Sequence, residues 1–319
     1  MDSENVQALE TLSGVLLELG DLEGGHNALL KSVELSPDQG HTKYLSLGQL
    51  SEGLQALDYY QRGIDLLSKA VERLSEDQEL DHEAVAKMDQ SNESITLKRE
   101  LSNACCAMAE IYMTDCCFEE DAENKCQTLI QKGILADPKN PEALQCMSNF
   151  LLVKEEIEEA KAKMQESLSL WLPKYQAVRE GRLDSSDFDP VEVCPLSYDA
   201  RINTSKLLIE LELYDEAGEV LEGLVEEDDE VIDTWYLLGW MNYLRGQDYW
   251  GNSRFYLNNT KKLTAKFGVD NPQILQHAEE LLEEMGPGED GEDENENEIN
   301  ENSKEEEEFE SSSGEEMEH

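Results

Sequence analysis

The sequence predicts an all-α fold, a superhelical solenoid of about six helix pairs followed by a single capping helix. Three observations predict it. Segments of about 34 residues recur along the chain, their apolar residues follow the helical period, and small residues return at fixed positions. A repeat of this length forms one helix hairpin, which buries its apolar face only by stacking on neighbouring hairpins.

The stretch "TWYLLGWMNYLRG", residues 234–246, carries the clearest repeat signature. Its Trp235, Leu238 and Gly239 form the W-x-x-L-G pattern that opens the first helix of a tetratricopeptide repeat. A large and a small residue on one face of this helix allow the second helix to pack closely. Arg201 stands 34 residues earlier at the corresponding position, which gives the length of one unit.

The same frame accounts for the other helix pairs in chain order. They are expected over residues 9–37, 44–74, 98–138, 141–173 and 199–228, and from 234 onward, with the capping helix at 271–285. In the third pair, the segment "TDCCFEEDAENK" makes the connecting loop about nine residues longer than the repeat requires. The sequence therefore predicts a tetratricopeptide-repeat solenoid over residues 1–285.

Three stretches depart from the repeat. Irregular loops are expected near 75–96 and 174–197, and long loops inside a compact array are usually functional or mobile. The second contains Phe188 among aspartates, which suits a segment folded onto the solenoid or over a ligand. Residues 286–319 hold almost no apolar side chains, so they are expected to form a disordered acidic C-terminal tail.

The net charge of the chain is −48. The tail holds 16 acidic residues and one lysine, so the first 285 residues still carry −33. Nucleic-acid binding requires lysine and arginine to neutralise phosphates, which argues against direct DNA or RNA binding. A field of this sign attracts cations, so a basic polypeptide is the expected partner. The plainer alternative is that the acidic residues keep the protein soluble.

Motifs of catalysis and of metal binding are absent from the sequence. It contains no P-loop, no GxGxxG and no HExxH, and its five histidines lack suitable neighbours. The seven cysteines include no CxxC pair, so they are expected to pack in the core as small apolar residues. We therefore expect a binding protein and no enzyme, with no cofactor and no metal site.

The expected location is the cytoplasm and nucleus. An odd number of cysteines fits a reducing compartment, and the acidic N-terminus lacks the features of a signal peptide. Apolar runs fall short of the ~20 residues that a membrane span requires, so no membrane association is expected. Without a basic localisation cluster, nuclear entry would depend on a partner.

A solenoid of this kind presents the first helix of each pair along a concave groove. From the repeat positions, the predicted partner-binding residues are Glu142, Asn149, Asp199, Asn203, Asp233, Tyr236, Trp240 and Tyr243. Three of them, Glu142, Asp199 and Asp233, stand at the second position of successive repeats as an acidic ladder. The helix dipole also favours acids in a first turn, so two explanations of the ladder are open.

Tyr236, Trp240 and Tyr243 form one stripe on their helix, about a quarter-turn from the packing stripe of Trp235 and Gly239. Aromatic rings beside acids can stack on arginine and hold aliphatic stems, which suits a basic chain. The alternative is that the last helix, 271–285, or the 174–197 loop covers these rings.

A carboxylate clamp for Hsp70 or Hsp90 tails is not expected. Such clamps use asparagines that match Asn149 and Asn203, together with basic residues. The basic positions here read Gln145, Asp233 and Leu237, so no cation is present to hold a terminal carboxylate. The reversed charge again favours a basic client.

Four stretches resemble one family in particular. They are "YLSLGQLSEGLQALDYYQRGIDLL", "AEIYMTDCCFEEDAENKC", "DFDPVEVCPLSYDARINTSKLLIELELYDEA" and "TWYLLGW". The family is the dedicated assembly chaperones of large-subunit ribosomal protein four, and the likeness covers nearly the whole chain. It implies a helical-repeat chaperone that captures the new ribosomal protein and shields its basic extension. It also implies entry into the nucleus with the client, through the client's import machinery, and release at the pre-ribosome.

Two other functions are compatible with the same residues. One is a scaffold or adaptor subunit of a stable complex, and the other is an acidic histone-type chaperone. Binding by a scaffold would be insensitive to salt, whereas charge-driven binding weakens as salt rises.

Overall fold

The computed structural model describes residues 5–80, 84–184, 190–268 and 272–288, and the regular structure in these ranges is all helical. Six helix pairs follow one another. They are α1 (Val6–Glu18) with α2 (Leu22–Leu35), α3 (Thr42–Gln49) with α4 (Gly53–Leu80), α5 (Ala84–Met113) with α6 (Ala122–Ala136), α7 (Pro141–Val153) with α8 (Ile157–Ser169), α11 (Tyr198–Glu210) with α12 (Tyr214–Glu227), and α13 (Ile232–Leu244) with α14 (Trp250–Phe267). Short helices α9 (Leu172–Arg179) and α10 (Pro190–Val193) follow the fourth pair, and α15 (Pro272–Met285) follows the sixth. The predicted all-α repeat fold, with six pairs and a capping helix in the described residues, is confirmed.

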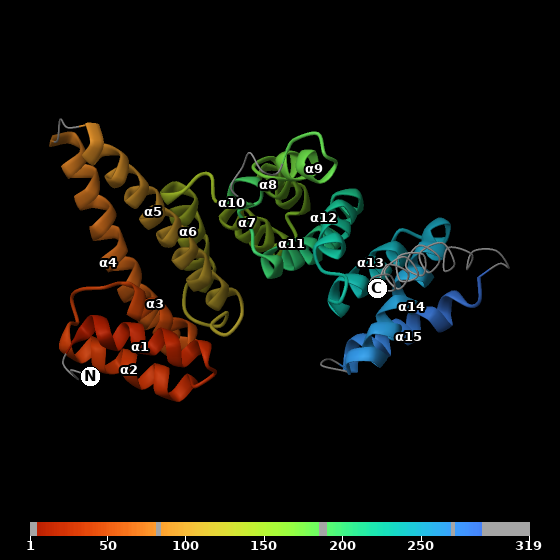
Figure 1. Ribbon diagram of the computed structural model, residues 1–319, viewed down its shortest axis with the longest axis horizontal. Coiled ribbons are helices and arrows are strands. Elements are labelled where there is room, and N and C mark those ends of the chain that lie inside the picture. The colour runs from red at the N-terminus through yellow and green to blue at the C-terminus, as the bar shows by residue number, and fades with distance from the viewer. Residues whose placement is uncertain (1–4, 81–83, 185–189, 269–271, 289–319) are drawn as a thin grey trace, which may run out of the picture. The chain divides into compact units, whose positions relative to one another are not determined.

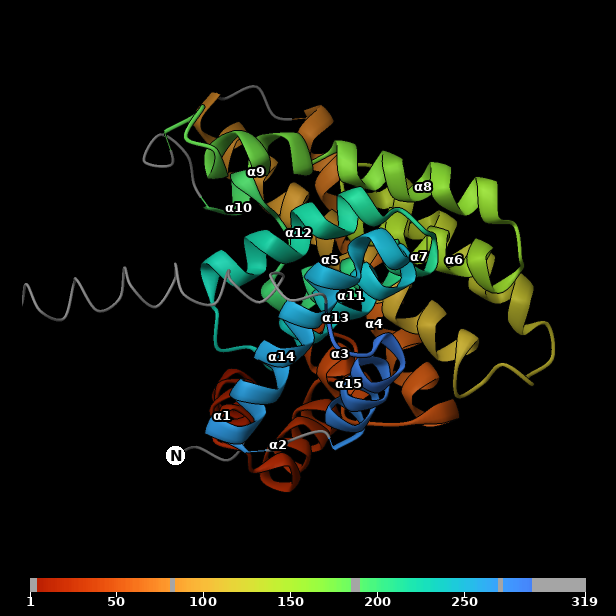
Figure 2. The same ribbon diagram turned by 90° about the vertical axis from the view of Figure 1, so that its right-hand side faces the viewer.

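The chain divides into two compact units, residues 1–196 and 197–319, which we call unit 1 and unit 2. Figures 1 and 2 show paired helices side by side within a unit, such as α1 beside α2 and α13 beside α14. The predicted solenoid over residues 1–285 spans both units and stays a prediction, and the inserted helices α9 and α10 precede the division. The predicted acidic ladder from Glu142 to Asp233 therefore falls on two units.

Small buried residues recur at one position of every first helix, where the second helix approaches. They are Ser13, Gly48, Cys106, Ser148, Ser205 and Gly239. A Cβ atom on Gly239 would stand 2.6 Å from the Leu257 side chain, which is 0% exposed. A Cβ atom on Gly48 would stand 2.7 Å from the Tyr60 ring. This close approach is the packing role that the sequence predicts for the small residue of the repeat.

Trp235 completes the packing seam of the sixth pair. Its ring lies against Phe255 and Tyr256 of α14, with centroids 6.3 and 6.0 Å apart, and its Nε1 donates to the Asp229 carbonyl at 2.8 Å. The stripe of α13 that carries Trp235 and Gly239 is therefore the packing surface, as predicted.

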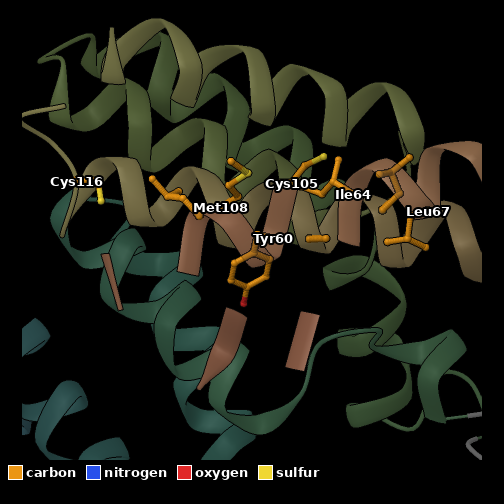
Figure 3. Close-up of a cluster of buried hydrophobic side chains, with 9 residues drawn as sticks. Tyr60, Ile64, Leu67, Cys105, Met108 and Cys116 are labelled. Carbon is orange, nitrogen blue, oxygen red and sulfur yellow. The ribbon is translucent and has the colours of Figure 1, made fainter. Parts of the chain in front are cut away.

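Two apolar clusters run through unit 1 and contain most of the cysteines. Figure 3 shows the cluster between α4 and α5, where Ile64 and Leu67 lie near Cys105, and Cys116 closes one end. A second cluster gathers Cys106, Cys126 and Cys146 between α5, α6 and α7. Five of the seven cysteines are buried, so their predicted role in core packing is confirmed for Cys105, Cys106, Cys116, Cys126 and Cys146.

The prediction of an irregular loop near 75–96 is wrong for the described part of that stretch. α4 continues to Leu80 and α5 begins at Ala84, while residues 81–83 lie outside the described residues. The physical reason is composition, because Glu, Gln, Leu, Ala and Lys favour helix and no glycine or proline interrupts the stretch. The acidic charge suggested a loop, but Glu and Lys are good helix formers.

The stretch near 174–197 is partly helical. α9 covers its beginning and α10 lies near its end, and the N–H groups of Arg182 and Leu183 both donate to the Ala177 carbonyl at 2.8 and 2.9 Å. Phe188 lies outside the described residues, as does the predicted acidic tail from residue 289 onward. Among the described helices, none has the length and apolar character needed to span a membrane.

Candidate functional site

An acidic groove lies on unit 1 between the first helices of three successive pairs. It encloses about 360 Å³ between α3, α5 and α7, with one wall residue from α4. Its polar lining consists of Gln49, Tyr60, Glu100, Asn103, Glu110 and Glu142. We call these residues the acidic groove.

Helix α5 supplies most of the groove from one stripe of its surface. Glu100, Asn103, Ala107 and Glu110 are spaced three, four and three residues apart, which places them on one side of a helix. The neighbouring stripe, which includes Cys105, is buried against α4. One helix therefore anchors in the core through one stripe and presents carboxylates through another.

Two carboxyl groups in the groove are partly stripped of water. Desolvation raises the pKa of Glu110, and the charge of Glu142 raises it further. Desolvation also raises the pKa of Glu142, although Arg99 lowers it in part. Arg99 is itself bound to Asp137 and to the Lys139 carbonyl. Both glutamates remain exposed as side chains, so an incoming cation can reach them and would stabilise their ionised forms.

The rest of the groove has the same sign of charge. Glu100 accepts a 2.8 Å hydrogen bond from His41 Nε2, when that nitrogen is protonated, at the start of α3. Burial raises the pKa of the Tyr60 hydroxyl, and the charge of Glu110 adds to the shift. Figure 3 shows this hydroxyl pointing away from the apolar cluster that holds the ring. The arrangement suits the binding of lysine or arginine side chains.

Sequence reasoning found Glu142 but missed the groove residues of α5. The third repeat has Ser102 and Cys106 where the sixth has Trp235 and Gly239, so its frame carries no strong signature. The signal that could have located them is spacing, because Asn103, Ala107 and Glu110 repeat the 236, 240, 243 pattern of α13.

The structure places the other predicted polar residues in first helices without bringing all of them together. Asn149 is half-buried on α7 in unit 1, with Glu142. Asp199 and Asn203 are exposed on α11, and Asp233 is half-buried in the first turn of α13, all in unit 2. Their role in binding a partner stays a prediction, and the helix-dipole explanation applies equally to the three acids.

The structure bears out the alternative for the aromatic stripe of α13, because α15 partly covers it, and a partner-binding role for its three residues stays a prediction. Tyr236, Trp240 and Tyr243 pack against the cluster that contains Leu281 and Met285 of α15. All three are half-buried. The physical reason is that adjacent rings expose a large apolar area, and the amphipathic α15 removes it from water.

Specific polar contacts fix α15 on this stripe. The Tyr236 hydroxyl lies 2.7 Å from Nδ1 of His277, and the His277 ring meets Trp240 edge-on with centroids 6.5 Å apart. Tyr243 stacks instead on Trp250 of α14, with centroids 6.1 Å apart. The contacts with His277 give Tyr236 and Trp240 a structural role in holding the capping helix.

Two of the three residues at the clamp positions take structural roles. Leu237 is 2% exposed, and Gln145 Nε2 donates to Ser167 Oγ at 3.2 Å. Within the described ranges, no group of three histidine, cysteine or acidic side chains is arranged to hold a metal ion.

Comparison with known proteins places the chain among named relatives, although no protein-family model matches it. It is 32% identical over 299 residues to a Schizosaccharomyces pombe protein named "probable assembly chaperone of rpl4", covering 88% of this chain and 80% of that protein. A protein of the same name from Emericella nidulans is 28% identical over 321 residues, covering 90% and 74%. Among solved structures, the assembly chaperone of RpL4, Acl4, matches with a TM-score of 0.67 at 29% identity, covering 76% of this chain and 84% of that one.

Proposed function

This chain belongs to the family of assembly chaperones of rpl4, and we propose that it binds and shields ribosomal protein L4, a basic protein of the large subunit, and delivers it to nuclear pre-ribosomes. The observation that supports the proposal most directly is the acidic groove of unit 1, where partial desolvation raises the pKa of Glu110 and Glu142. The fold and the family favour a binding protein, and we infer that the chain performs no catalysis.

The groove suits a basic client because part of the energetic cost of binding is already met in the free protein. Burying a charge normally requires its desolvation, but the groove walls have already removed part of the water around Glu110 and Glu142. Their mutual repulsion disappears when an ammonium or guanidinium group binds between them. Desolvation and repulsion of the two carboxylates slightly destabilise the free folded protein, and binding of the client removes this destabilisation.

The net charge of −48 extends the attraction for a basic client beyond the groove. A large field of one sign steers an oppositely charged partner and raises its rate of association. The same field repels nucleic acid, so the chaperone and ribosomal RNA compete for the basic surface of the client. Transfer of the client to RNA then follows from charge competition, which favours release at the pre-ribosome.

We propose that the protein works in both the cytoplasm and the nucleus and enters the nucleus with its client. The import machinery would contact the client and not this chain. A fluorescent fusion should lose its nuclear signal when the client is depleted, and unchanged nuclear signal would exclude this route.

A binding titration with purified ribosomal protein L4 tests the central proposal. The full chain should form a soluble complex with L4, and the affinity should fall steadily from low to physiological salt because the contacts are largely electrostatic. Histone proteins of similar charge serve as competitors. Failure to bind L4, or tighter binding of histones than of L4, would exclude the proposed function.

A further inference from the structure

The connection between α5 and α6 is longer than the corresponding connections of other pairs. Residues 114–121 form it, whereas three residues join α1 to α2, α3 to α4, α7 to α8 and α11 to α12. The longer loop is folded, since Cys116 N donates to the Ile111 carbonyl at 2.8 Å and Glu119 N donates to the Cys116 carbonyl at 3.1 Å. The Cys116 side chain anchors it in the apolar cluster of α4 and α5, as Figure 3 shows.

This anchored loop presents a large apolar side chain to solvent. Phe118 is 98% exposed, and the neighbouring Cys117 is exposed as well. A folded loop gains no burial energy from a phenyl ring in water, so the ring contributes nothing to packing in the free protein. Exposed aromatic residues on ordered surfaces are typical anchors of protein interfaces.

A pocket of about 330 Å³ opens beside the same loop, between α4, α5 and α6. Met108, Tyr112 and Leu129 supply its apolar lining, and Asp121 of the loop stands at its edge. The ammonium of Lys125 already lies 5.6 Å from the Tyr112 ring centre, within cation–π range. The Tyr112 ring therefore already holds one aliphatic stem with a positive end, and a basic side chain of the client would displace Lys125 from it.

The surroundings of the pocket favour a basic ligand over an acidic or neutral one. The loop contributes four carboxylates, Asp115, Glu119, Glu120 and Asp121. Burial raises the pKa of Tyr112, and nearby negative groups, among them Glu119, raise it further, which reports the local sign of the field. A second copy of this acidic chain would be repelled from such a surface.

The loop also continues directly from the acidic groove. Glu110 lines the groove, and its carbonyl accepts a 2.8 Å hydrogen bond from Oγ1 of Thr114, the first residue of the loop. Met108 and Tyr112, on another face of α5, line the pocket. A polypeptide that leaves the groove past Glu110 therefore meets the loop about one helical turn later.

We propose that the loop 114–121 and its pocket form a second docking site for the basic client, with Phe118 as the apolar anchor. The inference rests on the proposed function. The client would contact the groove with one basic segment and the loop with the adjoining segment. Two linked contacts raise the affinity above that of either alone, because the second forms at high effective concentration.

A matched pair of variants in the full chain tests the second site, with purified ribosomal protein L4 as the probe. Phe118→Ser should lower the affinity for L4 by about fivefold to tenfold, as expected for an aromatic anchor. Leu135→Ser is the control, because Leu135 is 80% exposed near the opposite end of α6 and should bind L4 as the wild type does.

Alkylation of Cys117 gives an independent readout, because the other described cysteines are buried or half-buried. Bound L4 should slow the modification of Cys117 several-fold. The second site would be overturned if the Phe118 and Leu135 variants bound L4 with equal affinity and Cys117 stayed unprotected in the complex. The proposed function would still stand, because the complex with L4 forms. If the wild type bound no L4, both the second site and the proposed function would be contradicted. If the free wild-type chain formed dimers as its concentration rose, and Phe118→Ser abolished them, the surface would instead bind a second copy of this chain.

Discussion

The acidic groove of unit 1 and the aromatic stripe of unit 2 occupy equivalent positions of the repeat but differ in what covers them. Asn103, Ala107 and Glu110 on α5 correspond to Tyr236, Trp240 and Tyr243 on α13. The first set lines an accessible groove, whereas the second lies under α15. The comparison shows that repeat position sets the direction of a side chain, while its chemistry decides whether the surface stays accessible.

The difference follows from hydration. Carboxylates and amides are strongly hydrated, so covering them fully with a helix of unit 1 would cost free energy. Exposure of three neighbouring aromatic rings to water is unfavourable, and packing against the apolar face of α15, where Ala278, Leu281 and Met285 are buried, removes part of that cost. The same stripe is therefore accessible in one unit and covered by a helix in the other.

The largest expected effect comes from disrupting this closure. Leu281→Asp places a charge in the cluster beneath α15, where Leu281 is 5% exposed. We expect unit 2 to lose about 3 kcal/mol or more of stability, because a buried unpaired charge and a lost apolar contact add together. Urea unfolding followed by tryptophan fluorescence should show the loss, since Trp235, Trp240 and Trp250 lie in this unit.

Glu283→Gln on the exposed face of α15 is the control for Leu281→Asp and should leave unfolding unchanged. If Leu281→Asp unfolded like the wild type, the aromatic stripe would not depend on α15. The contrast between a covered and an accessible stripe would then fail.

A smaller loss is expected from the packing seam. In Gly239→Ala the new Cβ would stand 2.6 Å from Leu257, so the helices must move apart. We expect a net destabilisation of about 1–2 kcal/mol, because overpacking outweighs the better helix propensity of alanine. Gly14→Ala on α1 has no atom within 4 Å of the new Cβ and should instead stabilise the protein. Thermal unfolding should show a lower melting temperature for Gly239→Ala and a higher one for Gly14→Ala. Equal changes in melting temperature would contradict the close packing at Gly239.

These seam residues show how much the sequence could predict. Gly239 and Trp235 revealed the repeat because close helix approach demands a small residue beside a large one, and the six pairs and the capping helix followed. The coverage of Tyr236 and Trp240 could not be read from the same pattern, since it depends on where α15 packs. The groove on α5 was missed because its repeat uses Ser102 and Cys106 at the signature positions.

The groove carboxylates should show opposite effects on binding and on stability. The double variant Glu110→Gln, Glu142→Gln should bind L4 about tenfold more weakly, since two charge-assisted contacts are lost. The free variant should melt slightly higher, by roughly 1–2 °C, because repulsion and desolvation of partly exposed carboxylates are removed. Glu158→Gln, Glu159→Gln in the exposed first turn of α8 removes the same charge and should leave the affinity for L4 largely unchanged, while loss of the favourable helix-dipole interaction should lower the melting temperature slightly. Parallel losses in both double variants would mean that net charge alone governs binding.

The raised pKa values of Glu110 and Glu142 predict the smallest effect, a pH dependence. The folded state holds these protons more tightly than the unfolded state, so the two groups favour folding at low pH and oppose it as pH rises through their raised pKa values, above the ordinary 4.5. Client binding has the opposite sign and should weaken a few-fold as pH falls through the same window. Titration calorimetry in two buffers of different ionisation enthalpy should detect proton release when L4 binds, and no release would contradict coupling to these groups.

Site-specific photo-crosslinking compares the two units most directly. A photoreactive residue replaces Asn103, which lines the acidic groove of unit 1, or Asn203, an exposed asparagine on α11 of unit 2. If the acidic groove binds the basic client, L4 will crosslink strongly from position 103, and the Glu110→Gln, Glu142→Gln background will reduce the yield. Crosslinking from position 203 with none from position 103 would contradict the central role of the groove.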